Sequence, residues 1–70
     1  MLVDINDKFI LHSENGKDYT IKVVNINTYR PPEQKYVVDV WDDQGQYAGD
    51  VKFVSDMFFL LNREKLEKVK

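Results

Sequence analysis

The sequence contains no cysteine and a single histidine, His12. It therefore cannot form a disulfide bond or a thiolate metal site, and a histidine-based zinc site is not expected from one imidazole. The longest run of large apolar residues, Met57 to Leu61, is far shorter than the roughly 20 residues that cross a membrane. The first residues also lack the basic-then-apolar order of a signal peptide. We therefore expect no metal, no cofactor, no membrane partner and, by default, a cytoplasmic location.

The chain also has little excess charge of either sign. Its net charge is −2, which is too mild for a nucleic-acid mimic and has the wrong sign for a simple nucleic-acid binder. Hydrophobic residues make up 43% and aromatic residues 13% of the chain, a composition that favours a folded domain over disorder. With 70 residues starting at Met1, we expect one domain over residues 1–70 and a complete small protein.

Two apolar runs near the N-terminus flank the dipeptide Asn15-Gly16. Such a dipeptide is the strongest short-range signal for a two-residue type I′ turn, in which both central residues need a positive φ. We therefore expect a hairpin between residues 8–13 and 18–29. Its faces would carry Ile10, His12, Tyr19 and Ile21 on one side, and Phe9, Leu11, Thr20 and Lys22 on the other.

The second strand of this hairpin is long, and its alternation slips midway. Ile21 and Val23 share one parity, whereas Val24 and Ile26 share the other. Because a one-residue slip sends every later side chain to the opposite face, we predict a bulge or sharp bend near Val23-Val24. Residues 30–34 contain both prolines and predict a loop.

Residues 36–54 predict a second hairpin, which holds the only tryptophan, Trp41. Acidic and basic residues mark the predicted solvent face, so the remaining alternate positions should face the core. The predicted core side chains of this hairpin are Tyr36, Val38, Val40, Tyr47, Val51 and Phe53. Trp41 has the parity of the solvent face, so the largest aromatic residue is expected outside the core.

Two registers of this second hairpin keep its apolar faces together. One opposes Asp39 and Asp50, and like charges that face each other are destabilising. We therefore prefer the other register, which pairs Val40 with Tyr47 and Val38 with Gly49. This choice leaves residues 42–45 as the loop, with glycine at position 45 where a positive φ is expected.

Two interpretations of the C-terminal segment stay open. In the first, residues 56–70 form one helix that Ser55 caps and that packs on an antiparallel sheet, an α+β fold. In the second, which we prefer, residues 57–61 form a strand, 63–66 a helical turn and 67–70 a last short strand. The preference follows because aromatic residues favour strands, whereas the residues after 62 are good helix formers.

The order of these predicted elements resembles that of the SH3-like small β-barrels. INDKFILHSENGKDYTIKVV resembles their opening hairpin, YVVDVWDDQGQYAGDVKFV their central meander, and FFLLNREKLEKV their closing strand, 3₁₀ turn and last strand. The resemblance implies an all-β, SH3-like small barrel of five to six mostly antiparallel strands with a short C-terminal helical turn. The ALYDY-type segment and the paired groove tryptophans of the signalling SH3 family are missing, so proline-peptide binding is not implied. The lone-domain format also resembles small phage- or prophage-encoded bacterial proteins.

Trp41 is the first candidate contact residue, because exposed tryptophans are uncommon and are enriched in binding hot spots. The alternative is that a terminal segment folds over Trp41. Tyr29 and Arg30 form a second candidate, since both types suit contact patches and precede two rigid prolines. The alternative there is a loop that the prolines stiffen. Asp39 and Asp43 flank Trp41 on the predicted solvent face, and we include them in the candidate partner-binding set.

The remaining charged residues have structural interpretations. The acidic cluster of Asp39, Asp42, Asp43 and Asp50 does not match a calcium-binding loop and is expected to be a solvated face. The basic tail, Arg63, Lys65, Lys68 and Lys70, is interrupted by Glu64 and Glu67. We expect helical ion pairs there, with a phosphate-binding strip as the alternative. His12 is expected to face Tyr19 in a structural role.

The sequence lacks a glycine-rich phosphate loop and a nucleophile motif, so no enzymatic activity is predicted. Our first hypothesis is a non-catalytic protein-interaction module, such as a small regulator or inhibitor of a larger protein. The second is a nucleic-acid-binding small barrel, and the third is a homo-oligomeric structural protein. We expect the chain to be a monomer or a weak homo-oligomer.

Overall fold

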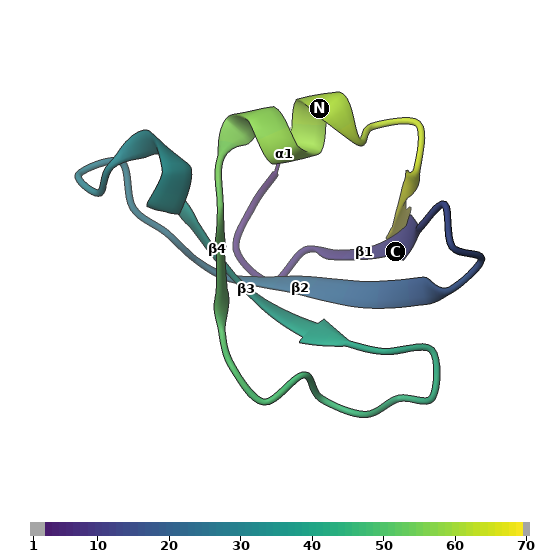
Figure 1. Cartoon of the computed structure of the whole chain (residues 1–70). Coiled ribbons are helices and arrows are strands. Elements are labelled where there is room, and N and C mark those ends of the chain that lie inside the picture. Colours follow the sequence, from purple (N-terminus) through teal and green to yellow (C-terminus); the bar gives the residue numbers. More distant parts are fainter. Residues whose placement is uncertain (1–2, 70) are drawn as a thin grey trace.

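The computed structural model describes residues 3–69, which form one antiparallel five-stranded sheet and one short α-helix (Figure 1). The elements are β1 (Lys8–His12), β2 (Asp18–Ile26), a 3₁₀ helix η1 (Pro32–Gln34), β3 (Tyr36–Trp41), β4 (Lys52–Val54), α1 (Asp56–Leu61) and β5 (Leu66–Val69). The strand order is β4-β3-β2-β1-β5, so the meander from β1 to β4 is completed by β5, which pairs with β1. The predicted all-β fold with a short C-terminal helical turn is confirmed.

The core lies between one face of the sheet and α1, which connects the two edge strands β4 and β5 (Figure 1). Phe59 of α1 is 3% exposed, and its ring centroid lies 5.6 Å from that of Phe9 and 5.0 Å from that of Tyr36. The buried cluster consists of Phe9, Ile21, Val23, Tyr36, Val38, Phe59 and Leu66. Burying a side chain of this kind contributes about 1.5–3 kcal/mol, so this small set supplies much of the driving force for folding.

The first hairpin forms where the sequence predicts it, but the predicted register is wrong by one residue. Phe9 pairs with Ile21, and the Ser13 amide donates to the Lys17 carbonyl at 3.1 Å. The turn therefore contains three residues, 14–16, and only Gly16 has a positive φ, at 83°. A three-residue loop that ends in a glycine bulge is the next common hairpin type after the two-residue turn.

This change of one residue turns the opposite face of β1 toward the side of the sheet on which Ile21 lies. Phe9 is fully buried, whereas Ile10 is only partly buried and His12 is exposed. Because side chains alternate along a strand, a single slip in pairing carries the whole set to the other side. The core thus receives the larger phenylalanine from β1.

The predicted bulge in β2 is confirmed. Val23 pairs with Val38 and Asn25 pairs with Val37, which leaves Val24 as the extra residue. The peptide of Val23 is held from the other side by the N-terminal segment: the Val23 amide donates to the Asp7 carbonyl at 2.9 Å, and the Asn6 amide donates to the Val23 carbonyl at 2.7 Å. The bulge therefore lies where β2 passes from one set of neighbours to another.

The preferred register of the second hairpin is wrong. Tyr47 forms a bridge with Trp41, not Val40, and Val38 pairs with Lys52, not Gly49. Between these two pairs, the chain that returns from Tyr47 to Lys52 contains two residues more than the matching part of β3. Gly49 lies in this irregular stretch and has a positive φ of 92°. Because of this irregularity, Asp39 and Asp50 are not opposed in a regular pair. The repulsion between them, which the preferred register was chosen to prevent, is therefore avoided in another way.

The same shift overturns part of the predicted core. Tyr47, Val51 and Phe53 are 45%, 47% and 48% exposed, because the return strand regains regular pairing only at Lys52–Val54. Val54 then faces Tyr36, and Phe53 faces Val37 on the outer face of the sheet, which is the side away from α1. The predicted turn over residues 42–45 is correct, and Gly45 has the expected positive φ, at 79°.

The C-terminal segment combines parts of both interpretations. Residues 57–61 are helical, so the predicted strand there is wrong, and Ser55 is the residue that precedes the first turn. The helix ends at Leu61, so the single helix over residues 56–70 is also wrong. A turn and the short strand β5 follow, as the preferred interpretation expects. An apolar run of this length fits a strand or a helix equally well, and here the side chain of Phe59 reaches the core from a helix.

Candidate functional site

The outer face of the sheet carries two aromatic side chains, Trp41 and Tyr47, together with Asp39. We call these three residues the outer aromatic cluster. Trp41 is the last residue of β3, and its bridge to Tyr47 brings the two ring centroids to 5.6 Å with a tilt of 57°. The Tyr47 hydroxyl donates to Oδ1 of Asp39 at 2.7 Å, which fixes the orientation of the ring. The predicted outward parity of Trp41 thus leads to a real surface cluster, with Tyr47 as a member that the wrong register had placed in the core.

The charges around this cluster are mainly acidic, with Lys22 on β2 opposite Asp39 as the basic neighbour. The hydrogen bond to Asp39 raises the pKa of Tyr47, and the negative charge of Asp50 adds to this effect. The phenol therefore stays protonated and remains a donor at physiological pH. Trp41 itself is partly buried, because Tyr47 covers one side of its ring, whereas Tyr47 is 45% exposed.

Asp42 and Asp43 occupy the turn next to the outer aromatic cluster. Oδ1 of Asp42 accepts the backbone amides of Gln44 and Gln46, both at 2.9 Å, so this carboxylate stabilises the turn. Asp43 is exposed at the tip of the turn. The turn thus holds one structural aspartate and one that is presented to solvent.

The second predicted contact pair lies toward the other end of β3. The Arg30 guanidinium carbon is 5.9 Å from the ring centroid of Phe53, which faces Val37 across β3 and β4. Val37 and Trp41 are four residues apart, which corresponds to about 13 Å along a strand. The structure therefore does not gather Arg30 into the outer aromatic cluster.

Tyr29 is 98% exposed in the loop before η1. Its backbone amide donates to Oδ1 of Asn27 at 2.9 Å, so the loop is ordered locally while the ring points into solvent. Arg30 is more enclosed, and its Nη1 is buried without a hydrogen-bond partner among the described residues. The predicted loop patch is therefore split into a solvent-exposed tyrosine and an arginine that packs on Phe53.

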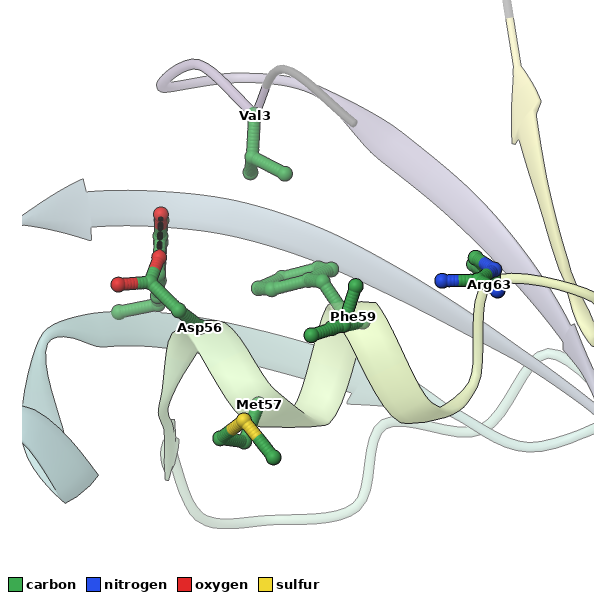
Figure 2. A pocket seen from close by; sticks show the side chains of 7 residues that line it. Val3, Asp56, Met57, Phe59 and Arg63 are labelled. Carbon is green, nitrogen blue, oxygen red and sulfur yellow. Dashed lines mark hydrogen bonds between the residues drawn. The ribbon is translucent and has the colours of Figure 1, made fainter.

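A cavity of about 280 Å³ lies beside α1, on the opposite side of the sheet (Figure 2). The residues that line this α1 pocket are Val3, Tyr36, Asp56, Met57, Phe59, Leu60 and Arg63. Figure 2 shows Asp56 and Arg63 at opposite ends of the helix, with Phe59 between them. The pocket therefore has an apolar centre with an anion at one end and a cation at the other.

Asp56 anchors the first turn of α1 to the sheet. Its Oδ1 accepts a hydrogen bond from the Tyr36 hydroxyl at 2.6 Å, and its Oδ2 lies 3.1 Å from Nζ of Lys35. These two donors lower the pKa of Asp56, and burial together with the same hydrogen bond raises the pKa of Tyr36. The carboxylate therefore stays ionised and the phenol stays neutral across the physiological range.

The outward side of α1 is apolar, and the sequence interpretation did not anticipate it. Met57, Leu60 and Leu61 are 52%, 50% and 73% exposed. We call these three residues the α1 face. Once residues 56–61 are known to be helical, the face follows, because Phe59 and these three residues project to different sides of a helix.

His12 lies on the outer face of β1 between two carboxylates. It pairs with Asp18, not with Tyr19 as predicted, and its Nδ1 is 2.9 Å from Oδ1 of Asp18. Its Nε2 is 3.3 Å from Oε2 of Glu67 on β5. The hydrogen bonds to Asp18 and then Glu67 raise the pKa of His12, so the imidazole links β1 to both of its neighbouring strands.

The basic tail does not form the predicted helical ion pairs. Lys65 lies 2.7 Å from a carboxylate oxygen of Glu14, and Lys68 lies 3.3 Å from one of Asp7. These pairs join segments that are far apart in the sequence, because this part of the chain is a turn and a strand. Lys70 lies outside the described residues.

Within residues 3–69, no group of three or more candidate ligand side chains is arranged to hold a metal ion. In the same range, none of the helices has the length and apolar character needed to traverse a bilayer. Comparison with protein-family models, with curated proteins and with solved structures gave no match to this chain. The case for function therefore depends on the surfaces described above.

Proposed function

We propose that this chain is a small, non-catalytic protein-interaction module that uses the outer aromatic cluster as its contact surface. The observation that carries the proposal is the packing of Trp41 against Tyr47 on the solvent side of the sheet, with Tyr47 held by Asp39. Tryptophan and tyrosine are the residue types most enriched at the centre of protein interfaces. Because Asp39 and the bridge to Tyr47 already fix the rings, little side-chain entropy is lost on binding.

The charges near the cluster indicate the kind of partner. Asp39, Asp43 and Asp50 outnumber Lys22, which lies opposite Asp39 on β2, and give this surface a mainly negative rim that complements a basic protein surface. The same rim would repel phosphate groups, so this surface favours a protein over a nucleic acid. A small acidic module of this kind suits the role of a regulator or inhibitor of a larger protein.

The architecture supports a module of the SH3-like type. The bulge in the long strand β2 and the short final strand β5 are features that the resemblance leads us to expect, and they support this part of the proposal. In this proposal the long strand β2 serves two halves of a small barrel, and the outer aromatic cluster lies on its outside. The only histidine, His12, is held by Asp18 and Glu67 at the surface, which supports a structural role for it.

The proposal is tested by partner capture followed by direct titration. Wild-type protein and the variants Trp41→Ala and Leu61→Ala are used as baits in lysate of the source cell, and captured proteins are identified by mass spectrometry. We expect a partner that is captured by wild type and by Leu61→Ala but lost with Trp41→Ala. In a titration with the purified partner, Trp41→Ala should weaken binding by about 2 kcal/mol or more, the range of a hot-spot residue.

Leu61→Ala is the matched control, because Leu61 is 73% exposed and belongs to α1 instead of the outer face. Circular dichroism must show that both variants are folded. Equal binding by wild type and Trp41→Ala would refute the proposal, and so would an unfolded Trp41→Ala protein, because Trp41 would then be a core residue. A salt-sensitive shift of a labelled oligonucleotide would favour the nucleic-acid hypothesis instead.

A further inference from the structure

After Asp56, every residue of α1 is apolar, although α1 is a surface helix. Phe59 points into the core and Phe58 is partly buried against it, while Met57, Leu60 and Leu61 point away at 52%, 50% and 73% exposure. A surface helix normally places polar residues on its solvent side, and a helix that is apolar all round is typically buried. The α1 face therefore has the composition of a covered surface, and residues 3–69 leave it exposed.

The charges at the two ends of α1 are opposite. Asp56 begins the helix and Arg63 follows its last turn, and the two lie at opposite ends of the α1 pocket (Figure 2). Lys35 accompanies Asp56 at 3.1 Å, and Glu64 accompanies Arg63 beside Leu60 and Leu61. If a second copy of the helix lies antiparallel to the first, each Asp56 meets an Arg63 and each Glu64 comes toward a Lys35. This is the self-complementary pattern that a twofold contact requires.

We propose that the α1 face is the contact surface of a homodimer, in which two copies of α1 pack antiparallel about a twofold axis. The α1 pocket and the shallower depression next to Leu61 supply the receiving surface, and Leu61 is the most exposed side chain of the face. The same short segment thus offers both a projecting leucine and an apolar hollow of about 280 Å³. In an isologous contact, each copy uses both features at once.

The size of this surface limits the affinity. A stable interface buries about 800 Å² on each partner. The accessible surface of the chain is 5015 Å², so such an interface would take roughly a sixth of it. One six-residue helix with its flanking charges covers less than that, so the dimer should be weak and should form only at high protein concentration. This inference does not depend on the proposed function, because α1 and the outer aromatic cluster lie on opposite sides of the sheet.

The test is the mass of the protein in solution, measured by analytical ultracentrifugation over a wide range of concentration up to the millimolar level. We expect wild type to pass from one chain to two as concentration rises. Leu61→Lys should raise the dissociation constant at least tenfold, because it puts two cations into the apolar centre. Arg63→Glu should also weaken association, and this effect should shrink as salt is added, because it depends on the pairing with Asp56.

Val51→Lys is the control, since Val51 is 47% exposed, close to the 50% of Leu60, but is not part of α1. It should dimerise as wild type does. Leu61 is 73% exposed, so Leu61→Lys should fold, and circular dichroism checks this. A wild-type mass of one chain at the highest concentration would overturn the inference. A folded Leu61→Lys protein that dimerises as tightly as wild type would also overturn the inference. A Val51→Lys protein that fails to dimerise would overturn it too.

Discussion

The protein contains two tyrosine–aspartate hydrogen bonds of nearly equal length, one on each side of the sheet. The Tyr36 hydroxyl donates to Asp56 at 2.6 Å, and the Tyr47 hydroxyl donates to Asp39 at 2.7 Å. Tyr36 is 7% exposed, whereas Tyr47 is 45% exposed. The same chemical pair therefore performs two tasks: the buried one fastens α1 to the core, and the exposed one orients a ring toward solvent.

The surfaces around these two pairs differ in the same way. The α1 face is aliphatic and lies between opposite charges, Asp56 and Arg63. The outer aromatic cluster holds two rings beside Asp39, with Asp50 acting on Tyr47 and Lys22 opposite Asp39 on β2, so its charge is mainly negative. In the two proposals, the opposite charges at the ends of α1 suit a second copy of this chain, whereas the aspartates beside the rings suit a basic partner. The comparison teaches that burial distinguishes the hydrogen bond that fastens α1 from the one that orients an exposed ring, which is the ring that our proposed function uses for recognition.

The largest effect should come from the side chain that holds α1 in place. Phe59→Ala removes a ring that is 3% exposed and packs on Phe9 and Tyr36. We expect it to lower the free energy of unfolding by about 3–5 kcal/mol, the usual cost of removing a buried phenylalanine. Urea unfolding measures this loss. The neighbouring variant Leu60→Ala, at a half-exposed position, should change stability by no more than about 0.5 kcal/mol, and similar costs for the two would mean that α1 is not anchored as described.

The two tyrosines provide the next test, because Tyr→Phe removes only the hydroxyl. Tyr36→Phe should lower the free energy of unfolding by about 1.5–3 kcal/mol, since it breaks a hydrogen bond to an ionised carboxylate in a partly buried site. Tyr47→Phe should leave stability nearly unchanged, because water replaces the lost bond at an exposed position. Thermal unfolding of both variants under one condition measures the difference. If Tyr47→Phe were the more destabilising change, the distinction between fastening and recognition would be wrong.

The smallest effect should come from His12, which belongs to neither surface. Hydrogen bonds to Asp18 and Glu67 raise the pKa of His12, so the folded state binds the proton more tightly than the unfolded state. The resulting stability is fully present below the ordinary pKa of about 6.5 and is lost as pH rises through the raised value. The melting temperature of wild type should therefore fall with rising pH more than that of His12→Gln. Identical pH profiles for the two proteins would contradict this linkage.

Much of the fold is predictable because it depends on local chemistry. The alternation of Val38 and Val40, the glycine at position 45 and the slip at Val24 each report a backbone requirement that a few neighbouring residues determine. The length of the first turn is different. Asn15-Gly16 fits either a two-residue or a three-residue turn, and the choice depends on whether Phe9 or Ile10 packs against distant α1. That information lies in residues far away along the chain.

The candidate site was predictable to the same extent. Parity alone places Trp41 and Asp39 on the outer face, where the structure has them. Tyr47 was missed because the irregular return strand shifts its register, and regular alternation cannot reveal an irregularity. The α1 face was missed because an apolar run such as residues 57–61 suits a buried strand as well as a helix, and only Phe59 in the core decides between them.

The pairing of β5 with β1 has a consequence for how the chain folds. Lys8 pairs with Val69, so this contact joins residues from near the two ends of the described chain, whereas the β1–β2, β2–β3 and β3–β4 contacts join neighbours in sequence. The entropy lost on closing a loop grows with the length of the loop. We therefore expect the meander to form first and β5 to dock last, and a chain in which β5 has not yet docked would present the edge of β1 with its backbone groups unpaired.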